Sequence, residues 1–205
     1  MKPPGAVVFL VDDDRSVLRA LGRLVRSAGF AVEAFASPRE FLERPPHLGP
    51  GCVVLDLRMP GASGLEVQAS MVAAGNLLPV VFLSGHGSVP ATVKAMKAGA
   101  VDFLTKPFED RELIAAIENG IARSVAARSE RAELEALRTR MASLTPRESE
   151  VFPLVARGLP NKQIAARLGT AEKTIKVHRA RVMEKMGAGS LADLVRMAGR
   201  VGSEG

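Results

Sequence analysis

The sequence has no tryptophan, no tyrosine and a single cysteine, Cys52. One cysteine excludes an internal disulfide. Long apolar runs are also missing: stretches such as Val7 to Val11 fall far short of the roughly 20 residues that a membrane helix needs. The opening MKPPGAVVFLVDDD has too short an apolar stretch for a secretory signal and ends in acid. Together these absences favour a cytoplasmic protein.

What is present has the composition of a soluble globular protein, with 205 residues, 47% of them hydrophobic and 24% charged, so that two domains fit within the chain. The charge is unevenly distributed. Residues 1–122 contain 12 Lys and Arg against 13 Asp and Glu, a net charge of −1, whereas residues 123–205 contain 16 against 9, a net charge of +7. The basic half favours a polyanionic partner, although a positive surface can also serve solubility alone.

The first half alternates short apolar runs with segments of helical periodicity. The five runs are Val7 to Val11, Ala31 to Phe35, Cys52 to Leu55, Pro79 to Leu83 and Ala100 to Leu104. Strands that are apolar throughout are expected where helices cover both faces of a parallel sheet, so the pattern predicts an α/β fold. Ligands of such sheets bind outside the carboxyl ends of the strands.

Polar residues follow four of these runs at the ends where ligands bind. They are Asp12, Asp13 and Asp14 after the first run, Asp56 after the third, Ser84 after the fourth and Lys106 after the fifth. Gathered carboxylates need a cation, and hard oxygen ligands suit Mg²⁺, while a lysine suits a phosphoryl group. This set predicts transfer of a phosphoryl group onto a carboxylate.

Asp56 is the predicted nucleophile because it stands alone at its strand end, whereas the three adjacent aspartates can supply a metal site. Each residue also has a plain structural alternative. Asp13 or Asp14 can cap the helix that begins near Arg15, Lys106 can belong to a simple turn before Pro107, and Ser84 can be an ordinary loop residue. The prediction therefore depends on four successive strand ends carrying such residues together.

Residues 6 to about 122 resemble the receiver domain of bacterial two-component response regulators, through the acidic pair, Asp56 with MPG following, Ser84, and Lys106-Pro107. The resemblance implies a flavodoxin-like (βα)5 fold with strand order 2-1-3-4-5 and a cis peptide before Pro107. It also implies Mg²⁺, with Mn²⁺ as a substitute. The implied metal ligands are Asp12, Asp13, Asp56 and the main-chain carbonyl of Arg58.

The same resemblance implies that Asp56 takes its phosphoryl group from a sensor histidine kinase and loses it slowly without being a classical enzyme. Ser84 and Lys106 would bind the phosphoryl oxygens, and an aromatic residue three positions before the lysine would turn inward. That residue is Phe103, where many relatives have tyrosine, so its response depends on packing alone. The resemblance further implies homodimerisation on phosphorylation.

The second half begins with a predicted helical linker, residues 123–140, and continues with a helix-turn-helix over residues 161–180. Thr145, Pro146 and Glu148 form a predicted capping box at an earlier helix start. A short helix from Asn161 to about Gly169 precedes a three-residue turn and a longer helix from about Glu172. Two helices joined so tightly are typical of DNA-binding proteins.

The longer helix divides into an apolar stripe, which includes Ile175 and His178, and a basic face. Lys176 and Val177 are placed to meet base edges and a thymine methyl group, and the flanking cations to meet phosphates. A solvated basic face is the alternative interpretation. The predicted DNA-contacting residues are Lys162, Lys173, Thr174, Lys176, Val177, Arg179, Arg181 and Lys185.

Residues 141–200 resemble the LuxR-type output domain, through LTPRE, NKQIA and TIKVH in order. The whole chain is therefore similar to the FixJ/NarL class of response regulators, with SGHGSVP and KAGAVDFLTKPF closest to the FixJ branch. The resemblance implies a receiver domain over residues 1–122, a four-helix DNA-binding domain over residues 141–205, a last helix that pairs two chains on double-stranded DNA, and RNA polymerase as a partner.

Two other functions compete with a phosphorylation-controlled transcription factor. An aspartyl phosphatase of the haloacid-dehalogenase kind needs a second aspartate two positions after its nucleophile, where this chain has Arg58. A regulator whose receiver ignores phosphorylation would have no need of the complete acidic pair, Ser84 and Lys106.

Overall fold

The computed structural model describes residues 3–85 and 89–202 and divides the chain into two compact units, Met1–Arg128 (unit 1) and Ser129–Gly205 (unit 2). Each unit is described by itself. None of the helices within the described residues is long and apolar enough to cross a membrane.

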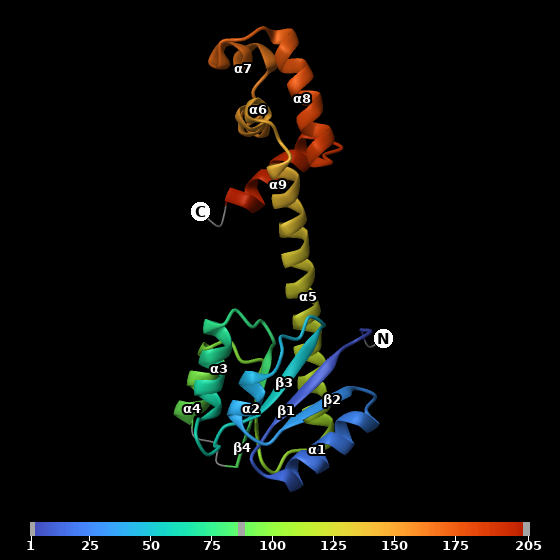
Figure 1. The fold of residues 1–205 in the computed structure, drawn as a ribbon, viewed down its shortest axis with the longest axis vertical. Helices are drawn as coiled ribbons and strands as arrows, with labels where there is room; N and C mark the ends of the chain where they lie inside the picture. Colours follow the sequence, from blue (N-terminus) through green and yellow to red (C-terminus); the bar gives the residue numbers. More distant parts are fainter. Residues whose placement is uncertain (1–2, 86–88, 203–205) are drawn as a thin grey trace. The chain divides into compact units, whose positions relative to one another are not determined.

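Unit 1 is an α/β fold in which five parallel strands have the order β2-β1-β3-β4-β5 (Figure 1). This confirms the expected flavodoxin-like order. The strands are β1 Val7–Val11, β2 Ala31–Phe35, β3 Gly51–Asp56, β4 Val80–Ser84 and β5 Asp102–Thr105. The helices between them are α1 Arg15–Ser27, α2 Pro38–Glu43, α3 Gly64–Ala73 and α4 Val89–Lys97, and α5 Asp110–Ala142 follows β5.

The fifth strand begins later than the sequence pattern suggests. Ala100 and Val101 are buried but precede β5, because the Ala100 N–H donates to the Ala95 carbonyl at 3.1 Å and closes the end of α4. The Val101 N–H then donates to Val80 at 2.7 Å and leads the chain into the sheet. Hydrophobicity alone therefore could not separate this buried turn from the strand that follows it.

The two faces of the sheet bury separate apolar clusters, because successive strand residues point to opposite faces. Along β1, Val8 and Leu10 pack with residues of α1 and α5, whereas Phe9 and Val11 pack with residues of α2 and α3. Figure 1 shows α1 and α5 on one side of the sheet and α3 and α4 on the other. Because helices cover both faces of the sheet, a functional site is expected at the ends of the strands.

Helix α5 is continuous over 33 residues and contains both the last helix of unit 1 and residues 123–140, predicted as a linker. Gly120, which looks like a break in the sequence, does not interrupt it. A Cβ atom at this position would lie 2.5 Å from Cys52 Sγ, so glycine is needed for the helix to approach β3. One turn later the buried Ser124 hydroxyl accepts a hydrogen bond from the Gly51 N–H at 3.2 Å.

Unit 2 is helical, with α6 Pro146–Ala156, α7 Asn161–Leu168, α8 Glu172–Met186 and α9 Leu191–Gly202 following the end of α5. The predicted capping box is present: the Thr145 N–H donates to Glu148 Oε2 at 2.9 Å and the Glu148 N–H to Thr145 Oγ1 at 3.3 Å. Gly169 ends α7 in the left-handed conformation, with φ 61°, and only Thr170 and Ala171 separate it from α8. This is the predicted helix-turn-helix.

Candidate functional site

The carboxyl ends of the strands bring together the side chains of unit 1 that the sequence singled out. Val11 pairs with Leu55, Asp56 with Leu83, and Ser84 with Thr105, so β1, β3, β4 and β5 end at one edge of the sheet. Asp12, Asp56 and Ser84 are buried there. Residues separated by up to 94 positions in the sequence thus meet at a single edge.

Asp12 and Asp56 are held in matching ways. One oxygen of each carboxylate accepts a hydrogen bond from the backbone N–H two residues later, Asp14 at 2.9 Å and Arg58 at 2.7 Å. The other oxygen of each accepts from the Lys106 ammonium, at 2.9 Å for Asp12 and 2.7 Å for Asp56. Such turns closed by an aspartate are common where a strand ends. They aim both carboxylates at one point.

Lys106 offsets one of the two negative charges of Asp12 and Asp56. Burial of its ammonium opposes the charged form, but the hydrogen bonds and charges of Asp56 and Asp12 outweigh burial, and the pKa of Lys106 is raised above its ordinary value. The lysine is therefore cationic at neutral pH. The peptide between Lys106 and Pro107 is cis, as expected from the resemblance.

The three adjacent aspartates have three different environments. Asp12 is buried, Asp13 is exposed, and Asp14 is the N-cap of α1. Asp14 Oδ1 accepts hydrogen bonds from the Ser16 hydroxyl at 2.6 Å and the Ser16 N–H at 2.7 Å, and these bonds lower the pKa of Asp14. Repulsion is thus limited, because Asp12 and Asp14 bond to different partners and Asp13 is exposed to solvent.

The donor set fits a divalent cation in part. Within residues 3–85 and 89–202, no three His, Cys, Asp or Glu side chains are grouped as a metal site. The carboxylates of Asp12 and Asp56 do converge, and the group between them is already a cation. Two buried hard oxygen ligands facing one cationic position match the chemistry of Mg²⁺, which keeps several waters. Asp13 would have to reorient to join them.

Two further predicted residues lie at the neighbouring strands. Ser84 is 1% exposed at the end of β4, where its carbonyl accepts from the Lys106 N–H at 2.7 Å. Phe103 is half-buried on β5, and its ring centroid lies 6.2 Å from that of Phe82. The Phe103 ring therefore already has an apolar contact on the sheet. His86 belongs to the SGHGSVP motif and lies outside the described residues.

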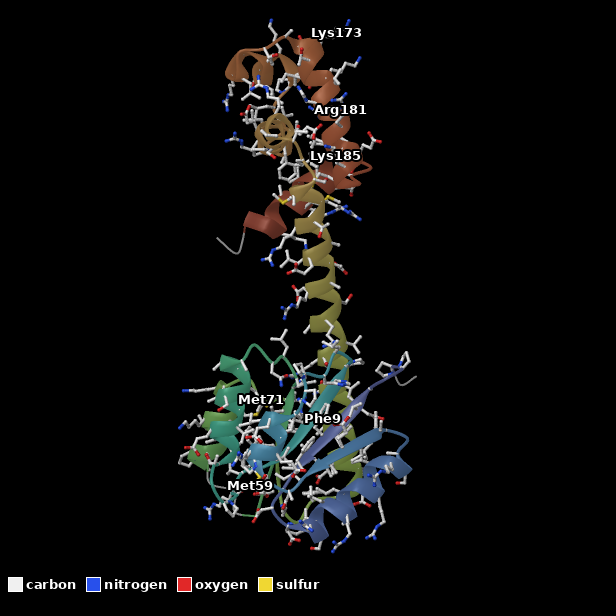
Figure 2. The ribbon with its side chains drawn as sticks, in the orientation of Figure 1. Phe9, Met59, Met71, Lys173, Arg181 and Lys185 are labelled. Carbon is white, nitrogen blue, oxygen red and sulfur yellow. The ribbon has the colours of Figure 1, made fainter. Side chains whose placement is uncertain are left out.

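The second candidate site is the basic face of α7 and α8 in unit 2 (Figure 2). The apolar stripe of α8 is buried, with Ile175, Val182 and Met186 each at 0% exposure, and His178 is half-buried. Six of the eight predicted DNA-contacting residues are exposed: Lys162, Lys173, Thr174, Lys176, Val177 and Arg181. Val177, at 46% exposure, is an apolar side chain among cations on this face.

Arg179 and Lys185 differ from these six because their side chains contact acceptors within unit 2. Arg179 Nη1 lies 3.5 Å from the Leu159 carbonyl and 3.4 Å from Asn161 Oδ1. Lys185 Nζ donates to Glu148 Oε2 at 2.7 Å and to the Ser143 carbonyl at 2.9 Å. Helical periodicity could not distinguish them from the exposed cations, because their partners come from other segments.

Backbone groups are the part of the unit 1 site that the sequence does not reveal. The N–H groups of Asp14 and Arg58 orient the two carboxylates. Because almost every residue has a main-chain N–H, these donors cannot be recognised from residue type. An aspartate directly after an apolar run is the one available indication, since such residues close turns onto the N–H two positions later.

Comparison with known protein families assigns both units. Residues 8–118 match the response regulator receiver domain, and residues 142–198 match the luxR family of bacterial regulatory proteins. The chain belongs to the response regulators that join a receiver domain to a LuxR-type DNA-binding domain. It is a transcriptional response regulator and not a member of a classical enzyme family, so the phosphatase hypothesis is set aside.

Curated relatives match nearly the whole chain. Nodulation protein W of Bradyrhizobium diazoefficiens is 47% identical over 96% of this chain and 87% of its own length. The transcriptional regulatory protein FixJ of the same species is 45% identical over 95% of each chain. The response regulator protein TodT of Pseudomonas putida is 44% identical over 98% of this chain and 88% of its own.

Solved structures support the same assignment. The response regulator StyR is 48% identical, with a TM-score of 0.85 over 95% of this chain and 98% of that one. Full-length FixJ from B. japonicum is 44% identical, with a TM-score of 0.60 over 98% of this chain and 99% of that one. The expected class of response regulator, including the similarity to FixJ, is confirmed.

Proposed function

We propose that this response regulator accepts a phosphoryl group at Asp56 from a sensor histidine kinase and that phosphorylation promotes dimerisation and binding to duplex DNA. Residues 1–122 would form the receiver domain, residues 123–140 a helical link, and residues 141–205 the DNA-binding domain. The observation that carries the proposal is the convergence of Asp12 and Asp56 on Lys106 at the carboxyl edge of a parallel sheet.

The chemistry follows from the roles of these groups. Asp56 attacks the phosphorus atom of a phosphohistidine, so that an O–P bond forms as the N–P bond breaks and the electron pair returns to the imidazole. One Asp56 oxygen accepts from the Arg58 N–H, whereas the other lies 2.7 Å from the Lys106 ammonium. Lys106 would transfer its contact to the phosphoryl oxygens, and Ser84 would bind another of them.

A metal ion completes the proposed site. Asp12, Asp13, Asp56 and the main-chain carbonyl of Arg58 would hold Mg²⁺, for which Mn²⁺ would substitute. Bound there, the ion would neutralise the carboxylates and the charge on the transferring group. The added phosphoryl charge, roughly −1.5 to −2 at neutral pH, would draw Ser84 toward it, and Phe103 would then repack. Dephosphorylation would be slow and would need no other enzyme.

In unit 2 the exposed residues of α8, together with Lys162 of α7, would contact DNA directly. Lys176 and Val177 would meet base edges in the major groove, with Val177 against a thymine methyl group. Lys162, Lys173, Thr174 and Arg181 would contact phosphates and set the register. Arg179 and Lys185 flank this surface and are held within unit 2. Arg179 would reach a phosphate by releasing its two long contacts.

The remaining partners follow from this role. Helix α9 would pair two chains on DNA, because Leu191 and Val195 are exposed apolar residues on one helix, at 37% and 45%. A transcription factor that binds DNA as a dimer would act through RNA polymerase in the cytoplasm.

The proposal is tested by comparing wild type with Asp56→Ala, and with Asp14→Ala as a control that alters a neighbouring carboxylate. With a small phosphoryl donor and Mg²⁺, wild type and Asp14→Ala should form acyl phosphate, whereas Asp56→Ala should form none. Genome-wide DNA binding of wild type and Asp56→Ala then identifies the target and its dependence on phosphorylation. Labelling of Asp56→Ala, or identical DNA occupancy with and without donor, would contradict the proposal.

A further inference from the structure

Lys185 lies in the last turn of α8, and its ammonium joins three segments of unit 2. It donates to Glu148 in the first turn of α6 and to the Ser143 carbonyl in the turn between α5 and α6, at 2.7 Å and 2.9 Å. Figure 2 shows Lys173 near the start of α8 and Lys185 near its end. The side chain thus anchors one end of a helix whose other end carries the proposed DNA contacts.

The partner of Lys185 is a buried carboxylate with a second task. Glu148 is 1% exposed, and the oxygen that accepts from Lys185 also accepts from the Thr145 N–H in the capping box of α6. The bond from Lys185, together with those from Thr145, lowers the pKa of Glu148 to about 2, so the carboxylate is ionised at neutral pH. Releasing Lys185 would leave this buried charge without its counter-ion, which is costly.

A second cation holds the same end of α8. Arg140, near the end of α5, donates from Nη1 to the Met186 carbonyl at 3.0 Å.

A small tilt of α8 would displace its DNA-contacting end. Lys173 and Lys185 are 12 positions apart, about 18 Å along a helix. With the C-terminal end held, a tilt of about 5° would move the N-terminal end by about 1.5 Å, enough to break a base contact that requires hydrogen-bond distances.

We propose that Lys185 is a positioning residue for DNA recognition: its bridge to Glu148 and Ser143 fixes the direction of α8, and it makes no contact with the DNA backbone. The inference rests on the proposed function only in that α8 must bind duplex DNA. A phosphate contact would require Lys185 to give up a buried carboxylate for a solvated phosphate, so the internal pair is favoured.

The test uses the full-length protein and two duplex probes of equal length, one selected by wild type from a random-sequence library and one of mixed sequence. The variants are Lys185→Met, Lys185→Arg and Glu148→Gln, with Lys162→Met as a matched control at an exposed lysine. Affinity is measured at several salt concentrations and at a temperature where circular dichroism shows every variant folded.

Lys185→Met should weaken binding to the selected duplex by about tenfold, the loss expected for one misplaced base contact. Its affinity for mixed-sequence DNA and its slope of log K against log salt should stay near those of wild type. Lys185→Arg should restore specific binding. Glu148→Gln should reproduce the loss even though it removes a negative charge, and adding Lys185→Met to it should cost little more, because both act on one pair.

Lys162→Met should behave differently, with a slope smaller by about 0.9 and similar losses on both probes, as one lost phosphate contact requires. The inference is overturned if Lys185→Met shows this Lys162 pattern, or if it binds both probes as wild type does. If wild type selects no duplex from the library, with or without a phosphoryl donor and Mg²⁺, the proposed DNA-binding function of α8 is refuted instead.

Discussion

Unit 1 and unit 2 build their candidate sites in opposite ways. In unit 1, Lys106 meets Asp12 and Asp56 from positions 94 and 50 residues away, because parallel strands end at one edge. In unit 2, five of the six exposed residues that are predicted to contact DNA come from one helix, α8. Yet each unit also has a half-buried lysine bonded to a buried carboxylate, Lys106 in one and Lys185 in the other.

The two lysines differ in the carboxylates that would lose a counter-ion if the lysine moved away. Lys106 pairs with two carboxylates. On the proposed function it would exchange them for a phosphoryl group, while a metal ion would become the counter-ion of the carboxylates. Lys185 neutralises Glu148, which also closes a capping box. We therefore expect the same kind of ion pair to be exchangeable in unit 1 and fixed in unit 2.

The largest effect is expected from removing the lysine of the exchangeable pair in unit 1. Lys106→Met should lower the rate of acyl-phosphate formation from a small donor by at least about 100-fold, because the transferring group loses a preorganised cation. Lys97→Met, which removes an exposed lysine on α4, is the control and should label normally. Quantitative labelling with Mg²⁺ measures the rate, and a near-normal rate for Lys106→Met would remove the lysine from the chemistry.

The next effect concerns the packing of α5 against β3 in unit 1. Gly120→Ala should lower the free energy of unfolding by about 1–3 kcal/mol, the usual cost of overpacking, because its Cβ would meet Cys52 Sγ. Denaturant unfolding of unit 1 measures the loss. Adding Cys52→Ala should recover part of it by removing the sulfur. If the double variant is simply the sum of two losses, the clash is not the cause.

A pH titration probes the fixed pair in unit 2. The pKa of Glu148 is about 2 in the folded protein against an ordinary 4.5, so its ionised form contributes stability above about pH 4.5. That contribution is lost as the pH falls toward 2. Amide hydrogen exchange in α6 should therefore show less protection for Glu148→Gln than for wild type at pH 7. The two should converge in acid, and a constant difference at all pH values would contradict the assignment.

The smallest effect is expected at the capping box of α3, which can be compared with that of α6. Ser63 and Glu66 cap α3 as Thr145 and Glu148 cap α6, but Glu66 is exposed. Ser63→Ala should therefore cost only about 1 kcal/mol of stability, the value of a local cap. Ser70→Ala in the same helix is the control and should be nearly neutral. Thermal unfolding measures both, and equal losses would show that the cap is not responsible.

The sequence predicts well whatever follows from local pattern and chain topology. The bounds of β1 and β2, the order of the sheet, the Thr145 cap and the turn after Gly169 all follow from residues close together in the chain or from general rules for parallel sheets. The convergence of Asp12, Asp56 and Lys106 follows for the same reason, since strand ends share an edge.

The sequence predicts poorly where a partner comes from another segment. Gly120 looks like a helix break until Cys52 is seen beside it, and Lys185 looks like one more basic residue until Glu148 is seen. The apolar pattern predicts a start of β5 that is too early, because Ala100 and Val101 are as apolar as strand residues. In each case the deciding contact is tertiary, and residue type and period contain no information about it.

The environment of Cys52 has a practical consequence. Its thiol is 0% exposed, and burial raises its pKa to about 12, so almost no reactive thiolate is present at neutral pH. A cysteine introduced on the surface of α8 should therefore react selectively with a fluorescent maleimide while Cys52 stays in place. Conversely, the slow rate at which Cys52 itself is modified would report how often the contact between β3 and α5 opens. The thiol is thus a natural probe of local opening in the receiver domain.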